Sequence, residues 1–118
     1  MDCQALADMV RKHGYDVLSV REDGGSCVID FLHPGVRLMR PVPYFASSLH
    51  YDKRRGTVEV TVRAKVPRYK ELYLDYCCED GEMVCRPHVW MEENMVSVEA
   101  KFRKDPVERL RMLLSEML

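Results

Sequence analysis

The chain has 118 residues, of which 47% are hydrophobic and 31% are charged, and its formal net charge at neutral pH is −1. A chain of this length is typical of one domain, which buries roughly two thirds of its unfolded surface without needing disulfides. Its apolar runs are only a few residues long, far below the ~18 residues that cross a bilayer, which argues against a membrane protein. We therefore expect a single domain over residues 1–118.

The cysteines indicate the redox environment of the protein. Their number is five, which leaves one unpaired in any set of disulfides. Near the N-terminus, Asp2 and Asp8 stand where a secretion signal would carry positive charge. Both observations favour a cytoplasmic location and reduced thiols.

The first element is an amphipathic helix over residues 2–13. Leu6, Met9 and Val10 lie on one face at helical spacing, and Gly14 follows where a left-handed C-cap is favoured.

A β-hairpin follows the helix, with strands over 16–21 and 26–33. The Asp23-Gly24 pair between them is a strong signal for a two-residue turn because it tolerates positive φ. A turn at this pair predicts one apolar sheet face made of Leu18, Val20, Cys27, Ile29 and Phe31.

The next stretch is less regular. Two prolines confine residues 36–44 to an edge strand or an extended loop, because proline cannot donate to a strand ladder. We then expect a strand over 45–51, a turn at 52–56, and a strand over 57–64 in which apolar and polar residues alternate.

The C-terminal third predicts a hairpin over 71–78 and 83–90, turned at Asp80-Gly81, and then a strand over 95–103. A helix follows from Pro106, with Asp105 as its N-cap and Glu108 completing a capping box. Its apolar face comprises Val107, Leu110, Leu113, Leu114 and Met117.

Together these elements predict an α+β domain: an N-terminal helix, a mainly antiparallel meander sheet of five to seven strands, and a C-terminal helix packed on one face. The buried sheet face should include Leu18, Ile29, Val60, Val62, Val98 and Phe102. In architecture alone, this order is similar to that of small cytoplasmic secretion chaperones and sensory-regulator domains. That resemblance implies a homodimer that binds other polypeptides, and it assigns no site residue.

A cluster of Cys77, Cys78, Cys85 and His88 suggests a metal or redox site. In the hairpin predicted over 71–78 and 83–90, however, Cys78 and Cys85 share one face while Cys77 and His88 point to the other. A tetrahedral site needs four converging ligands. We therefore expect no metal and no cofactor, and leave open a reactive or disulfide-forming Cys78/Cys85 pair. The sequence contains no phosphate loop or hydrolase motif, so we predict no catalytic residue.

The middle third of the chain is strongly basic, with nine basic and two acidic residues over 36–70. Either this segment forms a surface for an anionic partner, or its charges pair with acidic neighbours in the sheet. The candidate binding residues are Arg37, Arg40, Lys53, Arg54, Arg55, Arg63, Lys65, Arg68 and Lys70. As one stripe beside tyrosines, they would suit single-stranded nucleic acid.

The chain also holds eight methionines, whose flexible thioethers suit adaptable interfaces as well as cores. The favoured function is a non-enzymatic protein-binding or regulatory module, chaperone-like or adaptor-like, that self-associates through a sheet edge or a helix face. The alternative is a nucleic-acid-binding domain that uses the basic segment 36–70.

Overall fold

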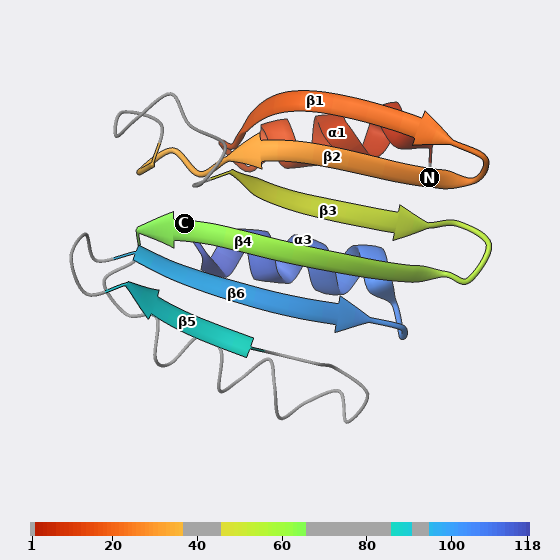
Figure 1. Ribbon diagram of the computed structural model, residues 1–118. Helices are drawn as coiled ribbons and strands as arrows, with labels where there is room; N and C mark the ends of the chain where they lie inside the picture. The colour runs from red at the N-terminus through yellow and green to blue at the C-terminus, as the bar shows by residue number, and fades with distance from the viewer. Residues whose placement is uncertain (1, 37–45, 66–85, 91–94) are drawn as a thin grey trace.

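The structure is a computed structural model that describes residues 2–36, 46–65, 86–90 and 95–118 (Figure 1). Its elements are α1 (Cys3–Lys12), β1 (Asp16–Asp23), β2 (Ser26–Leu32), β3 (Ser47–Asp52), β4 (Thr57–Lys65), β5 (Arg86–Trp90), β6 (Met95–Phe102) and α3 (Pro106–Glu116). The predicted α+β class, with a helix at each end of an antiparallel sheet, is confirmed. None of the described helices is long and apolar enough to cross a membrane.

The described strands form one six-stranded sheet in the order β1-β2-β3-β4-β6-β5, and every neighbouring pair is antiparallel. The predicted meander holds from β1 to β4 and fails after it, because β6 lies between β4 and β5. A physical reason is the proline in β5: Pro87 lacks an N–H and is best placed in an edge strand. The alternating strand β6 takes the central position instead.

Both helices cover the same face of the sheet, α1 behind β1 and β2, and α3 behind β4 and β6 (Figure 1). This inner face and the two helices share one hydrophobic core, in which the predicted Ile29, Val60, Val62, Val98 and Phe102 are all buried. The apolar face of α3 is also confirmed, since Leu110, Leu113, Leu114 and Met117 are buried and Val107 packs against them.

The first hairpin differs from its prediction at two places. The turn consists of Gly24 and Gly25, both with positive φ, and Asp23 pairs with Ser26. Two glycines meet the demand for positive φ at both turn positions better than Asp-Gly does. A β-bulge between Val17 and Ser19 then expels Leu18, which is 54% exposed, while Val17 packs against the core. The prediction that Leu18 is buried is therefore wrong.

The two helices begin differently. Asp2 caps α1, accepting the N–H of Ala5 at 2.7 Å, and Gly14 follows the helix with φ +94°. The predicted cap of α3 is wrong: Asp105 has left-handed angles and makes no capping bond. An N-cap residue needs extended angles to aim its oxygen at the first free amides, and Asp105 lacks them.

The prediction of reduced thiols is wrong for two cysteines. Cys3 at the start of α1 and Cys27 in β2 form a disulfide in the core, 24 residues apart in sequence. The helix and the strand bring these two positions together, which cysteine counting does not foresee. The other three cysteines, Cys77, Cys78 and Cys85, lie outside the described residues. So do residues 37–44 of the edge strand or loop predicted over 36–44, and most of the hairpin predicted over 71–90.

Candidate functional site

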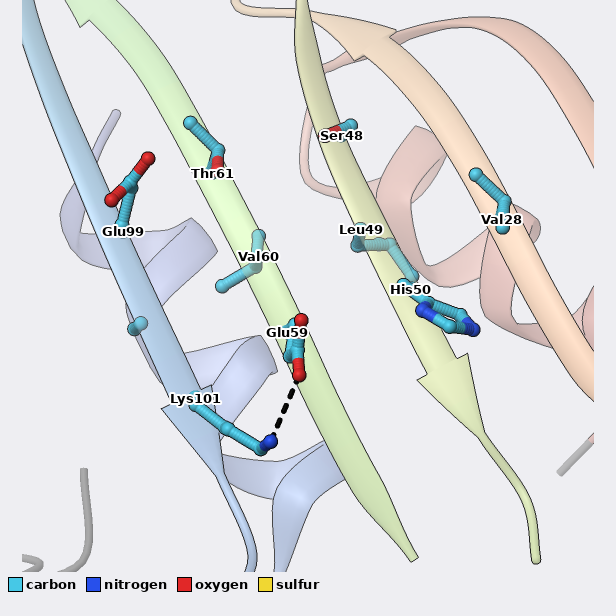
Figure 2. A pocket seen from close by; sticks show the side chains of 10 residues that line it. Val28, Ser48, Leu49, His50, Glu59, Val60, Thr61, Glu99 and Lys101 are labelled. Atoms are coloured by element: carbon cyan, nitrogen blue, oxygen red, sulfur yellow. Dashed lines mark ion pairs between the residues drawn. The ribbon is translucent and has the colours of Figure 1, made fainter. Parts of the chain in front are cut away.

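The outer face of the sheet, opposite the two helices, contains a hollow of about 420 Å³ (Figure 2). Strand register places Val28, His50, Glu59 and Lys101 side by side in a row across four strands. The hollow is lined by Val28, Ser48, Leu49, His50, Glu59, Val60, Thr61, Glu99, Ala100 and Lys101. We call the whole side of the sheet that carries this row of side chains, opposite the two helices, the outer face.

The shape of the hollow follows from side-chain size. A second row of outward-facing residues runs beside the first, two residues further along each strand. In this row Ser48 and Thr61 are cross-strand neighbours, and both side chains are short. The longer side chains of His50, Glu59 and Glu99 stand around them (Figure 2). Because successive residues of a strand alternate between the faces, the apolar neighbours Leu49 and Val60 are buried beneath.

Charged groups on the outer face pair across strands. The Nζ atom of Lys101 in β6 lies 2.9 Å from Oε1 of Glu59 in β4. On β1 and β2, Arg21 lies 3.4 Å from Asp30, whose carboxylate also accepts the hydroxyl of Ser19 at 2.9 Å. Cross-strand pairs of this kind stabilise a sheet by ~0.2–1 kcal/mol each. They leave both signs of charge interspersed on this face.

The side chains in the hollow can bind a partner that presents hydrogen-bond donors, hydrogen-bond acceptors and apolar groups together. Hydroxyls, an imidazole, carboxylates and an ammonium group lie beside the aliphatic Val28. Among the residues that the structure describes, no group of three or more His, Cys, Asp or Glu side chains is placed to hold a metal ion.

Three of the predicted basic residues lie together in the β3–β4 loop, at one end of the sheet. Lys53 forms an ion pair with Glu22 at 3.0 Å. The carboxylate of Asp52 accepts the backbone N–H of both Arg54 and Arg55, at 3.0 and 3.2 Å, and so orders the loop. Both Arg54 and Arg55 are exposed, and the Arg54 side chain lies against Gly25 in the turn of the first hairpin.

Arg63 lies elsewhere, near the far end of β4. Its Nη1 donates to the backbone oxygen of Ala46 at 2.7 Å. Its neighbour on β6 is Ser97. Between Arg63 and the loop, the same side of β4 presents Thr61 and Glu59, and Glu59 is already paired.

The described basic residues therefore do not form one continuous stripe. Lys65 ends β4, and the remaining candidates, Arg37, Arg40, Arg68 and Lys70, lie outside the described residues.

The sequence reasoning missed the row of His50, Glu59 and Lys101. Alternation in each strand could have indicated that these side chains share the outer face. The sequence did not indicate that β4 pairs with β6, because β5 lies between these two strands in the chain.

Comparison with protein families, characterised proteins and solved structures finds no match to this chain.

Proposed function

We propose that the chain is a non-enzymatic protein-binding module that holds a polypeptide partner on the outer face of its sheet. The observation that carries this proposal is the hollow among the central strands, on the face that neither described helix covers. The sheet beneath it is a rigid platform, and its side chains offer both donors and acceptors, as a polypeptide partner requires.

The charge pattern favours a polypeptide over a nucleic acid. Phosphate recognition depends on an excess of positive charge along the binding surface. In the two central rows of the outer face, the charged side chains that the structure describes are of both signs: Arg21, Asp30, Glu59, Glu99 and Lys101. A partner with its own mixed charges complements such a surface.

The test uses two variants, each with one photo-crosslinking amino acid. In the first it replaces His50, which is exposed on the outer face, and in the second, the control, it replaces Ser115, which is exposed on α3. The proposal expects protease-sensitive crosslinks in cell extract from position 50 and none from position 115. A second copy as the partner would give crosslinked dimers of the pure protein, and sedimentation would show self-association.

A matched pair of variants tests the face directly. Ser48→Arg fills the hollow from its floor, and Ser115→Arg places the same side chain on α3. The first should abolish the crosslink from position 50 and the second should preserve it, both with unchanged melting. Equal crosslinking in the two variants would contradict the proposal.

The alternative, a nucleic-acid-binding domain, is favoured by one observation: Arg54 and Arg55 are both exposed on an ordered loop. Titration with single-stranded RNA at several salt concentrations distinguishes it. Affinity that falls steeply with salt, together with nuclease-sensitive crosslinks, would replace the protein partner by a nucleic acid.

The compartment is the remaining part of the proposal. The cytoplasmic location expected from the sequence is part of this proposal. The buried Cys3–Cys27 disulfide is typical of proteins from oxidising compartments and favours the opposite. Thiol counting on protein denatured directly from cells decides between them.

A further inference from the structure

The C-terminal end of α3 is held by two side chains from the first third of the chain. Tyr15 donates its hydroxyl to the backbone oxygen of Leu114 at 2.7 Å, and His33 lies 2.7 Å from the backbone oxygen of Met117 through Nε2. The last carbonyls of a helix have no partner within the helix, so outside donors are needed when the helix end is buried. Both contacts are buried.

The hydrogen bonds of His33 define its protonation state. Gly35 donates its backbone N–H to Nδ1 at 3.0 Å, so Nδ1 carries a lone pair. The proton therefore resides on Nε2, which donates it to Met117. Both ring nitrogens are satisfied only in this neutral form, and a second proton would turn Nδ1 from an acceptor into a donor facing the Gly35 N–H.

The surroundings of His33 disfavour its charged form. The side chain is 4% exposed, and burial lowers the pKa of His33, an effect that the bond to Met117 offsets in part. The Tyr15 ring packs edge-on against the His33 ring, with the ring centroids 5.6 Å apart, and burial raises the pKa of Tyr15 well above its usual range. At the end of α3, the His33 ring contacts the backbone oxygen of Met117. Among the described residues, no charged side chain forms a hydrogen bond with the His33 ring.

We propose that His33 is an acid-sensitive latch on the C-terminal end of α3. Its protonation breaks the Gly35 contact and places a charge in a buried position. The Nε2 bond to Met117 survives protonation, so it is the buried charge that favours an open state, in which the ring and the last turn of the helix reach water. The closed state binds a proton more weakly than the open state. Lowering the pH therefore shifts the equilibrium toward the open state. Tyr15 and the rest of the core hold the remainder of α3.

Two measurements on the full chain test the latch. The NMR titration of the His33 ring should have its midpoint below about 6.5, the ordinary pKa of a histidine side chain. Amide exchange over residues 113–117, corrected for intrinsic rates, should accelerate about tenfold between pH 7 and pH 5.

Three variants separate the latch from general acid sensitivity. His33→Gln keeps an amide donor for Met117 and does not titrate, so the acid acceleration should disappear. His50→Gln should keep it. Tyr15→Phe removes the neighbouring bond, so exchange should be faster by the same factor at every pH.

The proposal is overturned if the His33 ring titrates with a midpoint at or above about 6.5, a result that needs no variant to fold. It is also overturned if the acceleration persists in His33→Gln, or if the loosening at low pH spares residues 113–117.

Discussion

Ser47 accepts the backbone N–H of Arg63 through its hydroxyl oxygen at 2.9 Å, so a side chain joins β3 to β4 just beyond the last paired residues, Ser48 and Thr61. Ser47 is fully buried. Ser47→Ala should therefore lower the free energy of unfolding by about 1–3 kcal/mol, since it leaves the part-buried N–H of Arg63 without this partner. Urea denaturation measures this loss. Ser48→Ala, one residue along and half-buried, is the matched control and should change stability by less than about 0.5 kcal/mol. Equal losses would mean that the hydrogen bond is not the cause.

Leu18 is expelled by the bulge in β1, whereas Phe31 in β2 is fully buried. We expect Leu18→Ala to change the unfolding free energy by less than about 0.5 kcal/mol and Phe31→Ala to lower it by about 3–5 kcal/mol. Thermal and urea unfolding of both variants provide the comparison. A large loss from Leu18→Ala would place this side chain in the core and contradict the bulge.

The disulfide between Cys3 and Cys27 closes a loop with a sequence separation of 24 residues. A crosslink of this span restricts the unfolded chain and contributes about 3 kcal/mol. Adding a reductant should lower the free energy of unfolding by that amount. The Cys3→Ser/Cys27→Ser double variant is the control, and its stability should not respond to the reductant. If the unmodified protein is equally unresponsive, the bond does not form in solution.

Arg54 and Arg55 are exposed, and the 3.8 Å contact between Arg55 and Asp52 is a surface pair. Replacing both arginines by alanine should change stability by no more than about 1 kcal/mol. Asp52→Ala should cost about 0.5–2 kcal/mol, because it removes the acceptor for two loop amides. If the alternative function holds, the double variant also weakens RNA binding and reduces the salt slope by about one for each phosphate that the arginines no longer neutralise. Unfolding of the double variant would make these arginines structural.

The pH dependence of global stability has a defined sign at His33. Burial lowers the pKa of His33 below its ordinary value of 6.5, so the unfolded chain binds the proton more readily. The contribution of the neutral ring to stability is complete above pH 6.5 and falls as the pH decreases through the folded-state pKa. Urea unfolding at pH 7.5 and pH 5 should show a larger loss for the unmodified protein than for His33→Gln. Identical losses would remove His33 as the cause.

Alternation of apolar and polar residues was sufficient to predict the regular elements. It located the strands around Ile29, Val60 and Val98, and helical spacing located α1 and α3. It could not predict the bulge at Leu18, because one extra residue reverses the inward and outward positions without changing the composition. Nor could it predict the left-handed conformation of Asp105, since a sequence that favours a cap does not fix the backbone angles.

The candidate site was predicted less well than the fold. The basic residues of segment 36–70 are close in sequence. In the fold, however, Arg54 lies in the β3–β4 loop and Arg63 lies near the opposite end of β4. The outer face depends on residues such as Glu59 and Lys101, which are distant in sequence and meet only through strand pairing. Contacts of this kind need the sheet order, and local patterns do not contain it.

The bond from Tyr15 to the backbone oxygen of Leu114 spans 99 residues of sequence. During synthesis, α1 and the first four strands emerge from the ribosome well before α3 does, and domains begin to fold from the N-terminal side. In that interval the Tyr15 hydroxyl and the apolar inner side of β4 have no helix to pack against. Closure of the core therefore waits until α3 has been made, and a chain that stalls before α3 would carry an uncovered hydrophobic surface.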